Sequence, residues 1–225
     1  MNQIKNNSSR YECEISKLKF IQKLVYPIKR NGIKALRSDD IAKYMGLSKA
    51  TLYKYFSSKD EIIKELVEYY IGELLEVTID NVDDAFSYVK EWQETFKNSL
   101  LSANFISDSF KNDLKESYPE LFEMVKKASQ KYNAKLIAFY KKGIDFGVFS
   151  DLNPAIVILQ DEAFFKDMLN PLYLMDNNLT IRTTINDYYK CKKIQVIKNE
   201  HQKLGDDKWE ELSEYLVQKV SSSIM

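Results

Sequence analysis

The sequence predicts an all-α fold, built from an N-terminal helix-turn-helix unit and a larger helical body. Only 6 glycines and 4 prolines interrupt the 225 residues. Apolar residues recur at helical spacing along most of the chain, whereas no stretch alternates apolar and polar residues as a strand does. A hydrophobic content of 44% is enough to bury the core of one large domain or two small ones.

The first helix is expected from Cys13 to Arg30, after a polar segment at residues 1–12 that we expect to be a disordered tail. Its apolar stripe consists of Ile15, Leu18, Ile21, Val25 and Ile28. The turn at Asn31-Gly32 should close the helix. Pro27 lies in its last turns, where the missing N–H and the pyrrolidine ring predict a kink.

Two short helices, joined at Gly46, are predicted between Arg37 and Asp60. Apolar side chains at helical spacing form the seam between them, namely Ile41, Ala42, Met45, Leu52 and Phe56. Gly46 allows the positive-φ turn that ends the first helix, and Ser48 caps the second. This is the spacing of a helix-turn-helix, whose second helix enters the major groove of DNA.

The same segment resembles, in residue types and order, the DNA-binding signature of the TetR family of bacterial transcriptional regulators. The residues that carry the resemblance are I-A-x-x-x-G-L-S-K-A-T-L-Y-K-Y-F-x-S-K-D-E, starting at Ile41, and the match extends over residues 15–70. The resemblance implies a DNA-binding domain at residues 13–72 and a helical effector-binding and dimerisation domain at residues 73–225. It also implies a homodimer that binds a double-stranded DNA operator.

The expected DNA contacts lie on and beside the second short helix. They are Arg37, Ser38, Ser48, Lys49, Ala50, Thr51, Tyr53, Lys54, Tyr55 and Lys59. The resemblance implies that Tyr53, Tyr55 and Lys59 hold phosphates. Among the polar side chains of this helix, Lys49, Thr51 and Lys54 are expected to read base edges.

Two positions depart from the family pattern, Pro27 and Arg37. Family members commonly carry an ordinary helix former at the first and Ser or Thr, as a helix cap, at the second. Ser38 is expected to take over the capping, and the acidic pair Asp39-Asp40 suits the positive N-terminus of a helix. These departures give slight support to an alternative function, an adaptor that acts through protein contacts with weak or no DNA binding.

Helices are predicted along the rest of the chain, at residues 59–79, 83–103, 105–116, 119–146, 154–168, 179–198 and 208–222. Ser57-Ser58-Lys59 caps the first of these, and Pro119 and Pro154 each open a helix in its first turn. The resemblance implies that the helix at 59–79 connects the two domains. It also implies that the helices at 154–168 and 179–198 form the dimer interface.

The net charge of zero hides an asymmetry between the two expected domains. Residues 1–72 hold 14 Lys and Arg against 8 Asp and Glu, a formal charge of +6, and the remaining residues hold 19 against 25, a charge of −6. A basic head on an acidic body suits a phosphate-binding module joined to one that does not bind nucleic acid.

Residues that carry catalytic or metal chemistry are scarce. The one histidine, His201, lies in a polar run, and the two cysteines, Cys13 and Cys191, have no metal-ligand spacing. No Gly-rich phosphate loop or nucleophile elbow occurs. We therefore expect neither an enzyme nor a cofactor. Because no run of about 18 apolar residues occurs, the protein is expected to be cytoplasmic, without a membrane partner.

Aromatic residues are the other distinctive feature of the body. Eight of them come from several predicted helices: Trp92, Phe96, Phe105, Phe110, Phe122, Phe139, Phe164 and Tyr173. Each one alone is more simply a core residue, but as a group they would suit an apolar small-molecule cavity, and the family arranges its body helices around an effector site.

Together these features favour a TetR-like transcriptional regulator, a repressor released from a near-palindromic operator by a small apolar or aromatic ligand. The adaptor is the alternative, and an unrelated helical enzyme is a third and weaker reading. Specific operator binding would separate the first two.

Overall fold

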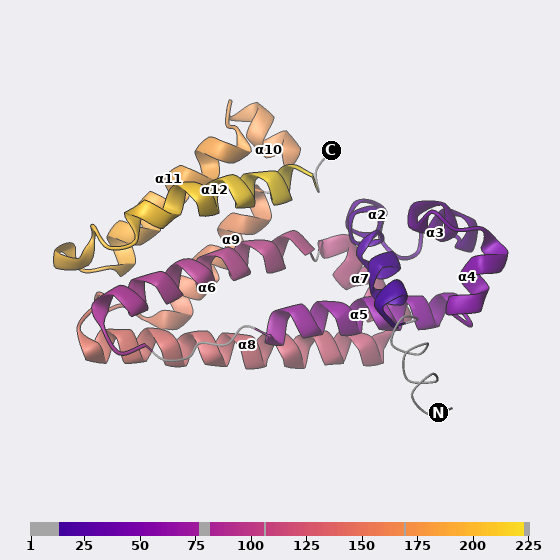
Figure 1. Cartoon of the computed structure of the whole chain (residues 1–225), viewed down its shortest axis with the longest axis horizontal. Helices are drawn as coiled ribbons and strands as arrows, with labels where there is room; N and C mark the ends of the chain where they lie inside the picture. The colour runs from indigo at the N-terminus through magenta and orange to yellow at the C-terminus, as the bar shows by residue number, and fades with distance from the viewer. Residues whose placement is uncertain (1–13, 77–81, 106, 169, 223–225) are drawn as a thin grey trace, which may run out of the picture. The chain divides into compact units, whose positions relative to one another are not determined.

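The computed structural model describes residues 14–76, 82–105, 107–168 and 170–222, and these are almost entirely helical (Figure 1). Residues 14–22 form the first helix. The others are α2 (Val25–Asn31), α3 (Ser38–Met45), α4 (Lys49–Tyr55), α5 (Lys59–Leu75), α6 (Ala85–Phe105), α7 (Asp108–Ser117), α8 (Pro119–Phe146), α9 (Pro154–Met168), α10 (Pro171–Asp176), α11 (Ile181–Val196) and α12 (Asp206–Ser221), with a short 3₁₀ turn at Asn199–His201. The predicted all-α fold is confirmed. The tail expected at residues 1–12 lies outside the described residues.

The predicted helix at 13–30 is two helices in the structure. The first is followed by a turn at residues 23–24, and α2 starts at Val25, so that Pro27 falls in its first turn. The N–H groups of a first turn have no intrahelical partner, so a proline there loses no hydrogen bond. The break before Pro27 therefore replaces the expected kink.

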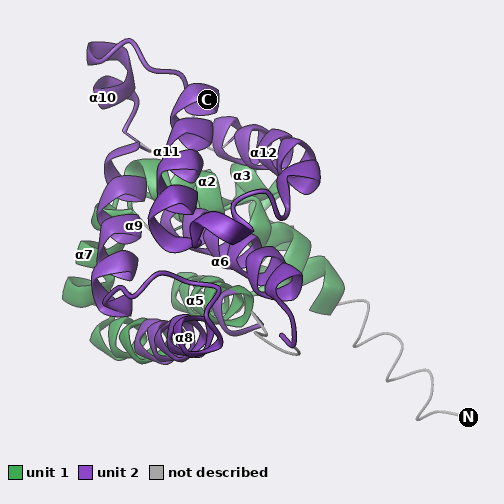
Figure 2. Ribbon diagram, turned by 90° about the vertical axis from the view of Figure 1, so that its left-hand side faces the viewer, with its two compact units in different colours: residues 1–73, 105–128 green, residues 74–104, 129–225 purple. Residues whose placement is uncertain are grey.

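The chain divides into two compact units, which Figure 2 colours separately. Unit 1 consists of residues 1–73 and 105–128, and unit 2 of residues 74–104 and 129–225. The three boundaries fall inside α5, before the last residue of α6, and inside α8. Compared with the expected division at residues 72 and 73, the segment 105–128, which includes α7, groups with the helix-turn-helix instead of with the body.

The reason for this grouping is visible in α7, whose apolar residues Phe110 and Leu114 are buried at 1% and 0% exposure. On the same helix, the Asp113 carboxylate accepts hydrogen bonds from backbone N–H groups of the turn between α2 and α3. No local pattern in the sequence predicts a contact between residues about 80 positions apart.

The core of unit 2 is a cluster of aromatic rings from α6, α8, α9, α11 and α12. Trp92 and Phe139 are each 1% exposed, and Phe96 is 3% exposed. Tyr189 on α11 stacks on Trp209 of α12, with ring centroids 3.4 Å apart. These ring contacts fix α11 against α6 and α12.

Candidate nucleic-acid interface

The turn between α3 and α4 has the geometry that the sequence predicts. Gly46 adopts φ 75°, in the left-handed region. Its N–H donates to the Lys43 carbonyl at 3.1 Å, and the N–H of Leu47 donates to the Ala42 carbonyl at 2.8 Å. This pair of hydrogen bonds is a Schellman motif, which ends α3 and starts the turn.

Ser48 caps α4, as predicted. Its Oγ accepts a hydrogen bond from the N–H of Thr51 at 3.1 Å and lies 2.8 Å from the Thr51 hydroxyl. The hydroxyl of Thr51, an expected base contact, is therefore oriented by the cap before any DNA is bound.

The cap of α3 differs from the prediction. The helix begins at Ser38, so the extended Arg37 is the N-cap residue, and the Asp40 carboxylate accepts from the Arg37 N–H at 3.1 Å. Ser38 has another partner, because its Oγ accepts a hydrogen bond from the Tyr53 hydroxyl at 3.0 Å. This bond ties the start of α3 to the outward face of α4.

The outward face of α4 carries Lys49, Ala50, Tyr53 and Lys54, all exposed to solvent, whereas Leu52 on the opposite face is 0% exposed. Lys49 pairs with Asp39 at 2.9 Å, and both side chains of this pair are more than half exposed. Exposed ion pairs contribute little free energy, so the Lys49 ammonium can exchange this carboxylate for a phosphate or a base edge at small cost.

Tyr55 and Lys59 lie in a different environment from the rest of the expected set. The Tyr55 ring meets Phe20 edge-on, with centroids 5.1 Å apart, and is half-buried. Nζ of Lys59 donates to the carbonyl groups of Ile33 at 2.9 Å and Leu36 at 2.6 Å. In this structure the Lys59 ammonium thus binds the protein backbone.

The start of α5 has a reciprocal arrangement similar to a capping box, in which Glu61 binds Ser57 in place of the N-cap residue Ser58. The N–H of Glu61 donates to Ser58 Oγ at 3.1 Å, as the predicted cap requires, and the Glu61 carboxylate accepts from Ser57 N–H at 2.6 Å. Hydrogen bonds from the Ser57 hydroxyl and N–H, followed by one from Lys17, lower the pKa of Glu61 to about 2. The spacing Ser58-x-x-Glu61 is the signal that points to this arrangement.

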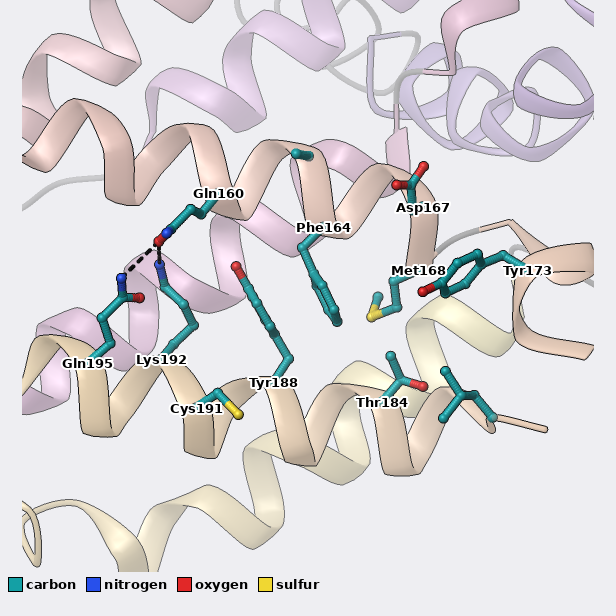
Figure 3. Close-up of a pocket in the computed structure, with 12 residues that line it drawn as sticks. Gln160, Phe164, Asp167, Met168, Tyr173, Thr184, Tyr188, Cys191, Lys192 and Gln195 are labelled. Carbon is teal, nitrogen blue, oxygen red and sulfur yellow. Dashed lines mark hydrogen bonds between the residues drawn. The ribbon is translucent and has the colours of Figure 1, made fainter. Parts of the chain in front are cut away.

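In unit 2, an open groove of about 640 Å³ runs between α9 and α11 and ends at α10 (Figure 3). At one end it is polar, where Gln160 accepts hydrogen bonds from Lys192 at 3.2 Å and from Gln195 at 3.0 Å. Its middle is a stacked pair of rings, Phe164 and Tyr188, with centroids 3.5 Å apart. The end near α10 is lined by Met168, Tyr173, Leu179 and Thr184.

A buried ion pair supports the polar end of the groove. Asp161 lies 3.2 Å from Lys192 and accepts a hydrogen bond from the Tyr188 hydroxyl at 2.7 Å. Burial raises the pKa of Asp161 and lowers that of Lys192, while their mutual attraction opposes both shifts. Asp161, on the largely apolar helix α9, thus has its partner within the same chain.

The eight expected ligand residues do not meet in one cavity. Phe164 and Tyr173 line the groove. Trp92, Phe96 and Phe139 are buried in the packed ring cluster of unit 2. The other three, Phe105, Phe110 and Phe122, belong to unit 1. Helical periodicity cannot separate a packed aromatic core from the wall of a cavity, because both need the same residues on the same face.

Within the described residues, no group of three or more His, Cys, Asp or Glu side chains is arranged to hold a metal ion. Among the residues that the structure describes, no helix is both long enough and apolar enough to cross a lipid bilayer.

Comparisons with known proteins agree with the helix-turn-helix geometry. The family model for bacterial regulatory proteins of the tetR family matches residues 28–66, from within α2 to within α5. Residues 28–66 thus form a helix-turn-helix of the tetR type, and the whole chain is similar to TetR family transcriptional regulators. Proteins of the TetR family are DNA-binding regulators and not enzymes, which fits the scarcity of catalytic residues noted above.

Two curated transcriptional regulators are similar to this chain in sequence. One is the uncharacterized HTH-type transcriptional regulator YvaF of Bacillus subtilis (strain 168), 40% identical over 53 residues, which are 24% of this chain and 27% of that protein. The other is the biofilm operon icaADBC HTH-type negative transcriptional regulator IcaR of Staphylococcus epidermidis (strain ATCC 35984), 24% identical over 155 residues, or 67% of this chain and 77% of that one.

The TetR fold extends beyond the matched segment. A TetR transcriptional regulator from Chloroflexus aurantiacus J-10-FL superposes with a TM-score of 0.58 at 14% identity, covering 83% of this chain and 98% of that one. At this identity, the likeness establishes a shared fold.

Proposed function

We propose that this TetR family regulator is a repressor that binds a near-palindromic operator as a homodimer and leaves it when a small apolar or aromatic molecule binds. The observation that carries the proposal is the outward face of α4, where two lysines and a tyrosine are exposed on a helix held by the Schellman turn and the Ser48 cap. A repressor role is also favoured by the name of IcaR, a negative transcriptional regulator.

In the proposed complex, α4 lies in the major groove, where Lys49, Thr51 and Lys54 reach base edges. Ala50 also lies in the groove. The remaining residues of the set lie toward the sugar-phosphate backbone, namely Arg37, Ser38, Ser48, Tyr53, Tyr55 and Lys59. The last two join this group only if they exchange their present partners, the Phe20 ring and the carbonyl groups of Ile33 and Leu36.

The homodimer is supported by exposed apolar side chains on α9 and α11. Ile156, Leu159 and Ile194 are 51%, 58% and 70% exposed, and they lie near the polar end of the groove, where Gln160 meets Lys192 and Gln195. Three exposed apolar side chains on two adjacent helices form a surface that a second copy of the chain can bury. Two recognition helices would then read half-sites about 34 Å apart.

The effector part of the proposal places an apolar or aromatic molecule among the body helices. The end of the groove near α10, where Tyr173, Met168 and Leu179 lie beside the Phe164 and Tyr188 rings, offers the apolar and aromatic wall that such a molecule needs. To lower operator affinity, the molecule must prefer the dimer conformation whose recognition helices do not match the two half-sites.

Selection of duplexes from a random library by the full-length protein, followed by sequencing, tests the DNA-binding part. We expect enrichment of a near-palindromic sequence, with half-sites one helical turn apart. If no sequence is enriched while the protein still binds partner proteins, the adaptor function is supported and the repressor is rejected.

Thiol labelling tests the homodimer. Cys191 lies on α11, is exposed in the single chain and lines the groove. In a Cys13→Ser background we expect Cys191 to react slowly with a bulky maleimide at micromolar protein, where a dimer forms, and quickly after dilution to the monomer. Equal rates together with a monomer in sedimentation would contradict the proposed interface.

The effector part is tested by screening apolar and aromatic compounds for a change in Trp fluorescence and then measuring operator affinity with each compound that binds. Coupling of about 1 to 3 kcal/mol would weaken operator binding about 5- to 150-fold. If no compound that binds the protein alters operator affinity, the release mechanism is wrong, although the operator-binding part stands.

A further inference from the structure

The turn between α2 and α3 is bound through its backbone by a carboxylate from α7. Oδ2 of Asp113 accepts hydrogen bonds from the N–H of Ile33 at 2.7 Å and from the N–H of Lys34 at 3.0 Å. Ile33 itself is 1% exposed. Hydrogen bonds between a carboxylate and backbone N–H groups are roughly twice as strong as neutral ones. The carboxylate thus fixes two consecutive peptide units of the turn.

The turn is shaped to receive this carboxylate. Gly32 adopts φ 73°, which favours glycine, and a Cβ at this position would lie 2.4 Å from Oδ2 of Asp113. Any larger residue would therefore push the carboxylate away from the two N–H groups. The close approach of α7 and the left-handed conformation both depend on the same glycine.

The carbonyl groups of the same turn are bound from α5. Nζ of Lys59 donates to the Ile33 carbonyl at 2.9 Å and to the Leu36 carbonyl at 2.6 Å. The turn is thus held by an anion on its N–H groups and by a cation on its carbonyl groups. The two helices that bind the turn are also joined directly, because the Tyr118 hydroxyl, just after α7, donates to the Asp60 carboxylate on α5 at 2.7 Å.

This turn leads directly into α3, which is in turn tied to the recognition helix. The Tyr53 hydroxyl on α4 donates to Ser38 at the start of α3, and Lys49 pairs with Asp39. A displacement of the turn therefore displaces α3 and α4 together. An acidic residue such as Asp113 is an unfavourable contact for DNA phosphates, so an effect on DNA binding has to pass through the turn.

We propose that Asp113 is a positioning residue for DNA recognition, which fixes the helix-turn-helix against α7 by holding the N–H groups of Ile33 and Lys34. The proposal extends the function of α7, which the sequence assigned to the body. It rests on DNA binding by α4, so its test includes one measurement that needs no operator.

The measurement without DNA is amide hydrogen exchange of the full-length protein. In Asp113→Ala we expect faster exchange at Ile33 and Lys34, while the N–H groups of α4 and α5 keep their protection. Asp113→Asn, which retains an oxygen acceptor but no charge, should exchange at an intermediate rate. Unchanged exchange at Ile33 and Lys34 in both variants would overturn the proposal.

The measurement with DNA compares affinity for the duplex selected by the wild-type protein with affinity for a scrambled duplex. Asp113→Ala should weaken specific binding by about 2- to 30-fold, the range for substitutions that act without touching either ligand, and leave the salt dependence and the scrambled-duplex affinity unchanged. Asp113→Asn should recover part of the loss. All affinities are measured where circular dichroism shows each variant folded.

Glu116→Ala is the matched control, because Glu116 lies on the same helix and pairs with Lys34 through exposed side chains. This variant should change neither the amide exchange at Ile33 and Lys34 nor the affinity for the selected duplex, since exposed ion pairs contribute little free energy. An equal loss of specific and scrambled-duplex binding in folded Asp113→Ala would show a general structural role and overturn the proposal. If wild type selects no duplex, the proposed function fails, and the exchange experiment alone decides whether Asp113 fixes the turn.

Discussion

Single residues in this protein take their roles from their neighbours in space. Lys59 and Asp113 illustrate this at the turn between α2 and α3, where one side chain binds carbonyl groups and the other binds N–H groups. The family resemblance implies a phosphate contact for Lys59, and nothing in the sequence draws attention to Asp113. Charge type alone does not tell whether a side chain faces DNA or the protein backbone.

The base-edge and phosphate roles on α4 predict different effects of substitution. Because Lys54 is proposed to read a base edge, we expect Lys54→Ala mainly to relax the preferred sequence. Weaker binding to every duplex, with the slope of log affinity against log salt reduced by about 0.9, would show instead that the lysine neutralises one phosphate and would contradict the base-edge role. Fluorescence anisotropy over a salt series distinguishes the two. Lys64→Ala, on the exposed face of α5, is the control and should do neither.

Thr51→Ala is expected to change which duplexes are preferred, because its hydroxyl is held beside the Ser48 cap at the start of the recognition helix. Repeating the duplex selection with this variant measures the change. The same enriched sequence, at the same affinity, would show that Thr51 does not read a base.

Glu61 predicts a pH dependence of stability. Its pKa in the folded protein is about 2, below the ordinary value of 4.5, so its contribution is fully present above about pH 4.5 and is lost as the pH falls toward 2. The difference in unfolding free energy between wild type and Glu61→Gln should therefore be constant near neutral pH and shrink between pH 4.5 and 2. Urea unfolding at several pH values measures it, with Glu68→Gln as an exposed control on the same helix. A difference that grew on acidification would contradict the capping role.

At the scale of whole elements, helix termini and buried polar contacts set the arrangement. Gln93 on α6 is 3% exposed and donates to the Tyr189 hydroxyl at 2.7 Å and to the Gly205 carbonyl at 2.9 Å, which joins α11 to the start of α12. Lys193 binds the same connection through the Leu204 carbonyl and Asp206. These contacts fix α12 over the aromatic core.

Gln93→Leu keeps the volume but leaves the Tyr189 hydroxyl and the Gly205 carbonyl buried without this donor. We expect a loss of about 1 to 3 kcal/mol in the free energy of unfolding, measured by urea denaturation. Gln218→Leu, at an exposed position on α12, should cost less than about 0.5 kcal/mol. Equal effects of the two substitutions would mean that the buried amide does not hold α12.

At the scale of the whole molecule, the main feature is a set of apolar side chains on α9 and α11 that a single chain leaves exposed to solvent. Ile194→Glu replaces a side chain that is 70% exposed here, so it should leave the stability of a single chain nearly unchanged. In the proposed dimer the new carboxylate would be buried, and the dimer should dissociate. Sedimentation at micromolar concentration measures this, and operator affinity should fall with it.

Phe86→Glu is the control, because Phe86 is also exposed, at 45%, but lies on α6. We expect this variant to behave as wild type in sedimentation. A dimer that persists in Ile194→Glu would place the interface elsewhere.

Sequence alone determined the all-α class, the positions of most helices, the turn at Gly46, the caps at Ser48 and Ser58, and the exposed face of α4. These depend on local rules, which are helical periodicity, side-chain capping and the freedom of glycine at positive φ. Such interactions join residues only a few positions apart, so the order of the residues specifies them.

Tertiary structure alone decided the grouping of α7 with the helix-turn-helix, the partners of Lys59 and Asp113, and the division of the aromatic residues between packed cores and the α9–α11 groove. Each of these depends on contacts between residues far apart in the chain. An aromatic or charged side chain at helical spacing satisfies the same local pattern whether it packs, pairs or faces solvent. Which of these it does is fixed only when the helices have come together.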